Sequence, residues 1–318
     1  MSILSKDISK AVALLNAEEI VAIPTETVYG LAGNIYSEKA ITSIFETKQR
    51  PFFNPLIVHI PSVDNLGEIV DYIPEKAKLL AETFWPGPLT LVLKKKNTIP
   101  LLITAGKDTV AVRVPNHPTT LKLLRQLDFP LAAPSANPFS SISPTTAEHV
   151  ETYFKDKIKM VLDGGACASG IESTIVGFEN DEPIIYRLGS TAIEDIEVIV
   201  GKIEIKNSKE IAPDAPGMLE RHYAPKTKTL LTDNIINVVN EHMDKRIGVI
   251  TYRSKIENAN IKEQVVLSKS GDLAESASKL YDALHQLDKM QLDIIIAEKF
   301  PDFGLGKSIN DRLLRATK

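Results

Sequence analysis

Two cations that could bind phosphate lie close together in the first sixty residues. Lys48 and Arg50 follow residues 38–47, whose apolar side chains recur with helical spacing. An ammonium or guanidinium group can neutralise phosphate charge, and the guanidinium fork can hold two oxygens at once. Cations at the end of a helix also complement its dipole, and most surface cations are simply solvated. The pair alone therefore leaves a phosphate site and an ordinary helix end as alternatives.

The residues that precede this helix are unusually polar for a strand exit. Residues 20–23 form an apolar run that predicts a buried strand, and Pro24 ends it. Thr25, Glu26 and Thr27 follow directly, and Gly30 and Gly33 predict a tight turn. Because open α/β sheets bind ligands outside the carboxyl ends of their strands, we expect a site here.

Two further strands carry a polar residue with possible chemistry. Residues 56–60 predict a buried strand that contains His59, and a histidine there is more often a packed core residue than a catalytic one. Residues 109–114 alternate, so Thr109 and Arg113 share one face. Arg113 either faces water or acts as an anion clamp in a pocket.

Composition excludes several classes of protein. The 318 residues carry a formal net charge of −4, which gives no global attraction for polyanions, so nucleic-acid binding would need a local basic patch. The single cysteine, Cys167, excludes an intramolecular disulfide and a multi-cysteine zinc site. The first residues contain no apolar signal segment and no run approaches a membrane span, so we expect a cytoplasmic protein.

The pattern along the chain predicts two α/β units. Up to about residue 202, short strands alternate with amphipathic helices. Residues 203–228 lose this periodicity and contain several prolines, which predicts a linker. Beyond them, strands are predicted at 230–231, 247–250 and 294–297, with helices at 235–243, 272–287 and 308–316. The segment GLGKS at residues 304–308 is not a P-loop, because position 301 is proline where that motif needs glycine.

Several separated motifs resemble the threonylcarbamoyl-AMP synthase family, whose catalytic domain is called YrdC-like. They are PTETVYGL at 24–31, KQRPFFNPLIVHI at 48–60, WPGPLTLVL at 85–93, PSAN at 134–137, GIESTIV at 170–176, an I-x-R-x-G pattern around Arg187, and PGM…HYAP at 216–225. The resemblance covers nearly the whole chain. It implies an α/β fold: a YrdC-like twisted mixed-sheet domain with flanking helices at 1–202, a linker at 203–228 that closes over the active site, and a smaller Rossmann-like α/β domain at 229–318.

The family resemblance also implies the reaction, in which L-threonine, bicarbonate and ATP give threonylcarbamoyl-AMP and pyrophosphate for tRNA modification. Lys48 and Arg50 are then expected to neutralise phosphate charge, with Mg²⁺ carried by ATP. The residues expected at ATP are Lys48, Arg50, Asn54, Thr109, Ser135, Asn137, Ser143, Arg187 and Tyr223. Those expected at threonine are Thr27, His59, Arg113, Ala133 through its backbone, and Ser173.

The resemblance implies partners as well, and two other functions compete with the synthase. The product would pass to a downstream threonylcarbamoyl transferase, and a weak contact with tRNA is possible. One alternative is an RNA-binding YrdC-like module without synthase activity, which the mildly acidic composition disfavours. The other is a carbamoyl-transfer domain of the hydrogenase-maturation type, whose zinc-finger-like segments do not fit a chain with one cysteine.

Overall fold

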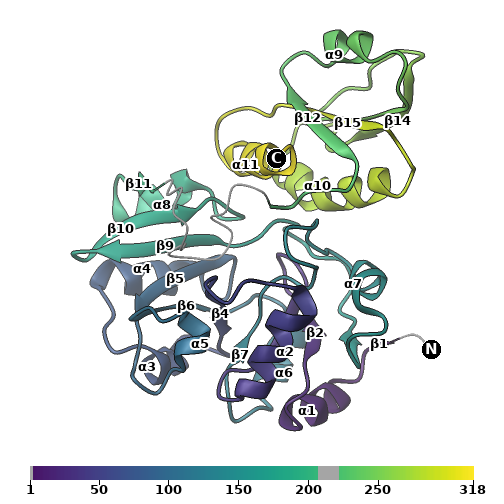
Figure 1. The fold of residues 1–318 in the computed structure, drawn as a ribbon. Coiled ribbons are helices and arrows are strands. Elements are labelled where there is room, and N and C mark those ends of the chain that lie inside the picture. Colours follow the sequence, from purple (N-terminus) through teal and green to yellow (C-terminus); the bar gives the residue numbers. More distant parts are fainter. Residues whose placement is uncertain (1–2, 207–221) are drawn as a thin grey trace.

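A computed structural model describes residues 3–206 and 222–318, which form a larger and a smaller lobe (Figure 1). The larger lobe contains one eleven-stranded mixed sheet with the order β1-β8-β2-β3-β7-β4-β6-β5-β9-β10-β11. Its strands are β1 (Leu4–Ser5), β2 (Val21–Ile23), β3 (Gly30–Asn34), β4 (Ile57–His59), β5 (Leu89–Lys94), β6 (Thr109–Arg113), β7 (Leu131–Ala132), β8 (Val161–Leu162), β9 (Thr174–Glu179), β10 (Glu182–Arg187) and β11 (Glu204–Ile205). The neighbours β4 and β6 are parallel, and their register pairs His59 with Arg113.

Helices bury the apolar side chains of this sheet in a large core, and smaller apolar clusters lie apart from it. They are α1 (Ile8–Asn16), α2 (Glu38–Lys48), α3 (Leu66–Ile69), α4 (Glu75–Phe84), α5 (Leu101–Thr104), α6 (Pro118–Leu124), α7 (Ala147–Phe154) and α8 (Ile193–Val200), with a 3-10 turn at Val63–Asn65. Val110 and Val112 of β6 lie in this core. Ala111 points to the other face, where it packs with Ile57, Val92 and Ile175. The alternation predicted for residues 109–114 is therefore confirmed.

The prediction of a tight turn at Gly30 and Gly33 was wrong, because both residues lie within strand β3. A Cβ atom on Gly30 would lie 3.1 Å from the Cβ of Ala133, and one on Gly33 would lie 3.1 Å from Cδ1 of Ile44 in α2. Close packing of β3 against its neighbours therefore favours glycine at these positions, and no turn is involved.

The smaller lobe is a parallel four-stranded sheet with the order β12-β15-β13-β14. Its strands are β12 (Lys228–Thr232), β13 (Ile247–Thr251), β14 (Ile261–Val266) and β15 (Ile294–Glu298), and its helices are α9 (Ile235–Glu241), α10 (Leu273–Asp288) and α11 (Leu305–Ala316). The second predicted α/β unit is thus present. Helix α9 lies on one side of the sheet and α10 and α11 on the other, so both faces are covered, as parallel sheets require (Figure 1).

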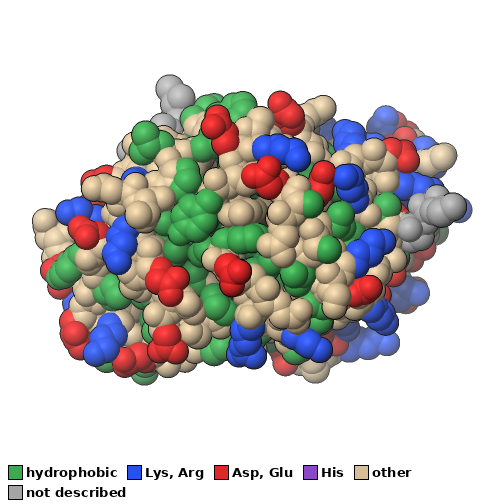
Figure 2. Space-filling view, turned by 90° about the horizontal axis from the view of Figure 1, so that it is seen from below, with side chains coloured by type: hydrophobic (Ala, Val, Ile, Leu, Met, Phe, Trp, Pro, Cys, Tyr) green, Lys and Arg blue, Asp and Glu red, His purple; other side chains and the backbone are tan. Residues whose placement is uncertain are grey.

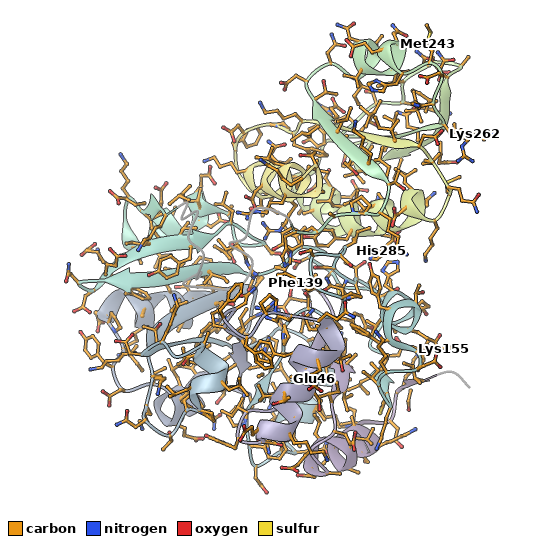
Figure 3. All side chains as sticks on the ribbon, viewed as in Figure 1. Glu46, Phe139, Lys155, Met243, Lys262 and His285 are labelled. Carbon is orange, nitrogen blue, oxygen red and sulfur yellow. The ribbon has the colours of Figure 1, made fainter. Side chains whose placement is uncertain are left out.

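Helices α10 and α11 also face the larger lobe (Figure 1). A Cβ atom on Gly170 would lie 2.4 Å from the backbone of Ser278, so the loop before β9 touches α10 directly. His285 of α10 points toward the larger lobe, where its ring stacks on His149 of α7 at a centroid distance of 3.8 Å (Figure 3). The Gly304–Ser308 segment begins α11, and Lys307 pairs with Glu194 of α8 at 2.8 Å.

Most of the predicted linker at 203–228 lies outside the described residues, so the division at 202 and 229 remains our proposal. The last described strand of the first sheet ends at Ile205, and the first strand of the second sheet begins at Lys228. In the part of the chain that is described, no helix is both long enough and apolar enough to cross a membrane.

Candidate functional site

A polar cavity of about 50 Å³ lies over the face of the larger sheet at β4 and β6. Strand alternation puts Ile57 and His59 on the same face of β4, and both line the cavity beside Arg113. Thr25 and Thr27, which follow β2, line the cavity, as predicted for a site at the end of that strand. Residues on the face of β4 and β6 also line it, so the site extends over the face of the sheet and is not confined to the strand ends. The lining residues are Thr25, Thr27, Val28, Gly30, Arg50, Ile57, His59, Arg113, Ala133, Pro134, Ser135, Glu172, Ser173, Arg187, His222 and Tyr223.

One corner of the cavity is built around Arg113, the last residue of β6. Its Nη2 forms an ion pair with Glu26 Oε1 at 2.6 Å, and its Nη1 donates to the Thr27 hydroxyl at 3.0 Å. Its Nε donates to the carbonyl of Gly87 at 3.1 Å, which lies in the predicted Trp-Pro-Gly-Pro turn. These three contacts fix a buried guanidinium at the cavity wall. Such a group can bind a carboxylate through two oxygens.

His59 stands next to Arg113 and is neutral. Burial, with a smaller contribution from the charge of Arg113, lowers its pKa to about 3. Its Nδ1 is buried and has no hydrogen-bond partner among the described residues. A neutral imidazole here can donate or accept one hydrogen bond, and it adds no charge to the site between pH 5 and 8.

Lys48 and Arg50 are both buried, which ordinary surface cations at a helix end are not. The Lys48 ammonium donates to the carbonyls of Ser135 and Asn137, at 2.5 Å each. Arg50 donates to the carbonyls of Asn54 and Pro55, at 3.3 and 2.8 Å. Within the described residues, neither cation forms an ion pair with a carboxylate. Helix α2 thus ends in two buried positive charges that only carbonyl dipoles offset.

Burial makes these charges costly. It lowers the pKa of Lys48 well below its ordinary value, with a smaller contribution in the same direction from Arg50. Burial also lowers the pKa of Arg50 to about 9, and the charge of Arg187 adds to this effect. An anion bound beside them would offset the free-energy cost of burying the two charges and would reduce the repulsion between them.

A third cation, Arg187, closes the opposite wall from the end of β10. Its Nη2 donates to the carbonyl and the hydroxyl of Ser173, at 2.8 and 3.1 Å. The Ser173 hydroxyl also lies 2.7 Å from that of Thr90. Ser173 and Arg187 are therefore joined by hydrogen bonds, although Ser173 directly precedes β9 and Arg187 ends β10.

The remaining predicted residues differ in how close they come to the cavity. Ala133 and Ser135 line it, whereas Asn54, Asn137 and Ser143 lie behind the lining. The Ser143 hydroxyl is already engaged, because it donates to Glu172 at 2.6 Å. Thr109 lies four residues before Arg113 on the same face of β6, roughly 13 Å away along the strand, and does not line this cavity.

Buried polar atoms without partners gather in this region. The side-chain amide of Asn54 has no partner at either atom although the residue is fully buried. Four further buried atoms also have no hydrogen-bond partner among the described residues: Oδ1 of Asn137, Oε2 of Glu26, Nδ1 of His222 and the Tyr223 hydroxyl. Because buried polar groups in proteins are almost always satisfied, this concentration indicates that a polar ligand supplies the partners.

His222 and Tyr223 come from the predicted linker and cover the cavity. Tyr223 is 1% exposed, its ring lies 4.1 Å from that of His222, and the Ala224 amide donates to the carbonyl of Ser140 at 2.9 Å. Across residues 3–206 and 222–318, no three His, Cys, Asp or Glu side chains form a group that could hold a metal ion.

Glu172 is a site residue that the sequence reasoning missed. It lines the cavity, but nothing in the GIESTIV motif distinguishes this glutamate from an ordinary acidic side chain. Its main charge partner is Arg312, 140 residues away, at 2.8 Å. No local spacing pattern could have revealed that pair.

The comparisons with known proteins agree with this architecture. A family model described as telomere recombination matches residues 13–189, and one described as the C-terminal domain of threonylcarbamoyl-AMP synthase matches residues 191–317. The chain is 40% identical over 319 aligned residues to a threonylcarbamoyl-AMP synthase of Bacillus subtilis, covering 97% of this chain and 92% of that protein. A threonylcarbamoyl-AMP synthase of Pyrococcus abyssi is 39% identical, with 96% and 93% covered.

Solved structures give the same result. The crystal structure of Pyrococcus abyssi Sua5 complexed with L-threonine superposes with a TM-score of 0.92 at 38% identity, covering 99% of this chain and 96% of that one. Full-length HypF in its phosphate- and nucleotide-bound form matches 57% of this chain at 24% identity with a TM-score of 0.51, which is a likeness of fold alone. The matches span both lobes in order, and the chain belongs to the threonylcarbamoyl-AMP synthase family.

Proposed function

We propose that this protein is an L-threonylcarbamoyladenylate synthase, a nucleotidyltransferase. Lys48 and Arg50 carry the proposal, because both are buried cations whose hydrogen-bond partners among the described residues are carbonyls. Arg50 lines the polar cavity, and Lys48 lies behind the lining, where it donates to the carbonyl of the lining residue Ser135. A polyphosphate chain supplies the anion that this arrangement lacks. Family membership supports the choice of ATP and threonine over other substrates.

The reaction requires positioning more than covalent chemistry. The amine of L-threonine adds to the carbon of bicarbonate and water leaves, which gives a carbamate. A carbamate oxygen then attacks the α-phosphorus of ATP, and pyrophosphate leaves with the electron pair of the broken P–O bond. No protein nucleophile is needed, so the site residues act by orientation and charge neutralisation. The one cysteine fits this account, since burial raises the pKa of Cys167 to about 12 and keeps its thiol protonated.

We assign the corner around Arg113 to threonine. The guanidinium takes the substrate carboxylate, held in place by Glu26, Thr27 and Gly87. His59 offers its unpartnered Nδ1, and the Ala133 backbone and the Ser173 hydroxyl complete the amino-acid side.

We assign the walls around Lys48, Arg50 and Arg187 to the triphosphate. Ser135 lines the same wall, and Asn54, Asn137 and Ser143 stand behind it. The unpartnered side-chain amide of Asn54 and the unpartnered Oδ1 of Asn137 support direct contact with the nucleotide once the wall adjusts. Mg²⁺ would arrive with ATP and stay bound mainly through phosphate oxygens, because the described residues offer it no carboxylate cluster.

An apolar strip leads from the cavity toward Thr109 and suits the nucleobase. Ile57, Val92, Ala111 and Ile175 form a small cluster on the face that carries the cavity. An adenine ring needs an apolar surface of this kind with a polar group at its end. Thr109 lies at the end of the strip, at the start of β6.

Thr109→Val therefore tests how far the nucleotide reaches. We expect the KM for ATP to rise about threefold to tenfold, because one neutral hydrogen bond is lost, while the KM for threonine stays unchanged. Steady-state kinetics with each substrate varied in turn measures this. An unchanged KM for ATP would remove Thr109 from the site.

The lid formed by His222 and Tyr223 must move for ATP to enter. The covered cavity of about 50 Å³ is far smaller than the roughly 300–1,000 Å³ of sites that hold molecules of this size. We propose that His222 and Tyr223 move aside to admit substrates and that Tyr223 returns over the bound nucleotide.

The depressed pKa of Lys48 predicts proton uptake when ATP binds. In the free protein Lys48 loses its proton as pH rises through its lowered pKa, and a bound phosphate raises that pKa again. Above about pH 8, where phosphate groups are fully ionised, ATP binding should take up a fraction of a proton and weaken with rising pH. Calorimetry in two buffers of different ionisation enthalpy measures the uptake, with Lys48→Met as the control that should abolish it. Binding without uptake at any pH would show that Lys48 does not meet phosphate.

The wider setting follows from the product. Threonylcarbamoyl-AMP would be passed to a transferase that modifies tRNA, so we propose a cytoplasmic location. Direct RNA binding is the alternative activity, but on the face in Figure 2 acidic and basic side chains together surround a central band of hydrophobic ones. A surface of mixed charge is poorly suited to a polyanion.

The experiment that separates these functions is pyrophosphate release by the purified full-length protein. With ATP, Mg²⁺, L-threonine and bicarbonate present, release should occur, and omitting either threonine or bicarbonate should abolish it. Release that ignores threonine would overturn the synthase. Tight tRNA binding that falls steeply with salt, without any release, would favour the RNA-binding module.

A further inference from the structure

Helices α10 and α11 of the second lobe contact Glu172, a residue of the larger lobe that lines the catalytic cavity. The Glu172 carboxylate is 5% exposed, and its Oε1 accepts a hydrogen bond from Ser143 at 2.6 Å. Its Oε2 accepts from the Tyr281 hydroxyl of α10 at 2.9 Å and from Arg312 Nε of α11 at 2.8 Å. Two of these three contacts come from the smaller lobe, although Tyr281 and Arg312 do not line the cavity themselves.

Arg312 is fully buried between the lobes, which is rare for an arginine. Besides Glu172, its Nη2 donates to the Leu188 carbonyl of the larger lobe at 2.7 Å, and its Nη1 pairs with Asp311 at 2.6 Å. Its guanidinium also lies over the ring of Tyr223, 4.8 Å from the centroid. The same side chain therefore holds a cavity carboxylate and supports the lid.

Two arginines act on the charge of Glu172. Burial alone would raise its pKa, but Arg312 first and Arg187 second hold it below the ordinary value. Arg187 ends β10, which pairs with β9, and it donates a hydrogen bond to Ser173, the residue after Glu172. If Arg312 were lost, Glu172 would be a buried carboxylate whose nearest remaining cation is Arg187. Uncompensated buried charges are strongly unfavourable, so the two would be drawn together.

We propose that Arg312 is a positioning residue for the ATP side of the site: by neutralising Glu172 from the second lobe, it leaves the Arg187 guanidinium directed at the nucleotide. This inference rests on the proposed function, since it concerns how that site meets ATP. It gives the C-terminal domain a defined role, which is to supply the counter-charge for one wall of the catalytic cavity.

Four variants test the proposal: Arg312→Met, Glu172→Gln, the double variant, and Arg315→Met. The last is a control for loss of an arginine from α11, because Arg315 lies one turn from Arg312 and shares its partner Asp311 but pairs with that residue rather than with Glu172. Arg312→Met should raise both the Kd and the KM for ATP by about tenfold or more, with a much smaller change for threonine. Removing the carboxylate as well should bring both values back to within about threefold of the wild type. Arg315→Met should resemble the wild type.

The pH dependence gives a readout that a merely structural role would not move. Without Arg312, burial raises the pKa of Glu172, so lowering the pH protonates the carboxyl and releases Arg187. The KM for ATP of Arg312→Met should therefore fall toward the wild-type value as the pH is lowered from 8 to 6. The double variant has no carboxylate to protonate and should show no such recovery.

Melting temperatures identify variants that do not fold. If Arg312→Met is unfolded, Arg312→Lys takes its place, because lysine keeps the charge but loses the fork. Under the proposal Arg312→Lys binds ATP with a Kd within about threefold of the wild-type value.

Unchanged ATP binding in folded Arg312→Met, or failure of Glu172→Gln to rescue it, would overturn the inference. ATP binding without product in the wild type would overturn the proposed function instead, while the binding comparison still decides the role of Arg312.

Discussion

Arg50→Ala is expected to lower the rate of pyrophosphate release at saturating threonine by at least about tenfold. The guanidinium is buried at the cavity wall, and alanine would remove both its charge and its donors to phosphate. A charge-assisted hydrogen bond contributes roughly 1.5–3 kcal/mol, and each 1.4 kcal/mol or so lost in the transition state is about tenfold in rate. If Arg50 neutralises the charge that develops as pyrophosphate leaves, kcat and kcat/KM should fall together.

The control for Arg50→Ala is the same substitution at Arg125, which is exposed at the end of α6. Arg125→Ala should leave turnover unchanged. Equal rates for Arg50→Ala and the wild type would show that Arg50 only holds the carbonyls of Asn54 and Pro55. A rise in the KM for ATP at constant kcat would instead assign Arg50 to ground-state binding.

Arg113→Lys is the second substitution with a large expected effect, although it keeps the positive charge. Arg113 contacts Glu26, Thr27 and Gly87 from three different nitrogens, and a single ammonium on a flexible chain cannot do this and also bind a carboxylate through two oxygens. We expect the KM for threonine to rise about tenfold or more, with a much smaller change in the KM for ATP. Kinetics with threonine varied at saturating ATP and bicarbonate measures it. A normal KM for threonine would mean that Arg113 is a structural partner of Glu26 only.

The sequence predicted most of the elements that bury a clear apolar pattern. Residues 38–47 were expected to be helical and form α2 (Glu38–Lys48), and residues 294–297 lie in β15 (Ile294–Glu298). Strand β14 (Ile261–Val266) was missed, because it is an edge strand whose half-buried residues show neither alternation nor an apolar run. Strand β3 was taken for a turn, because its glycines are favoured by close contacts with Ala133 and Ile44 that no local pattern encodes.

The site residues were predictable where they lie in motifs and unpredictable where they depend on long-range contacts. Thr27, Arg50 and Arg113 were found from their motifs or strand positions, and the structure brings all three to one cavity. Their geometry depends on contacts such as that between Thr27 and Arg113, 86 residues apart, which only the folded sheet creates. Glu172 and Arg312 were missed for the same reason, since neither residue is distinctive until the two lobes pack together.

The most direct test of the central claim is the fate of the bicarbonate carbon. Purified protein is incubated with isotope-labelled bicarbonate, L-threonine, ATP and Mg²⁺, and the products are separated quickly and examined by mass spectrometry. We predict a single new species that contains threonine, AMP and the labelled carbon, formed in equal amount to pyrophosphate. Pyrophosphate without such a species, or an adenylate of threonine that lacks the label, would contradict the assignment of this cavity to threonylcarbamoyl-AMP synthesis.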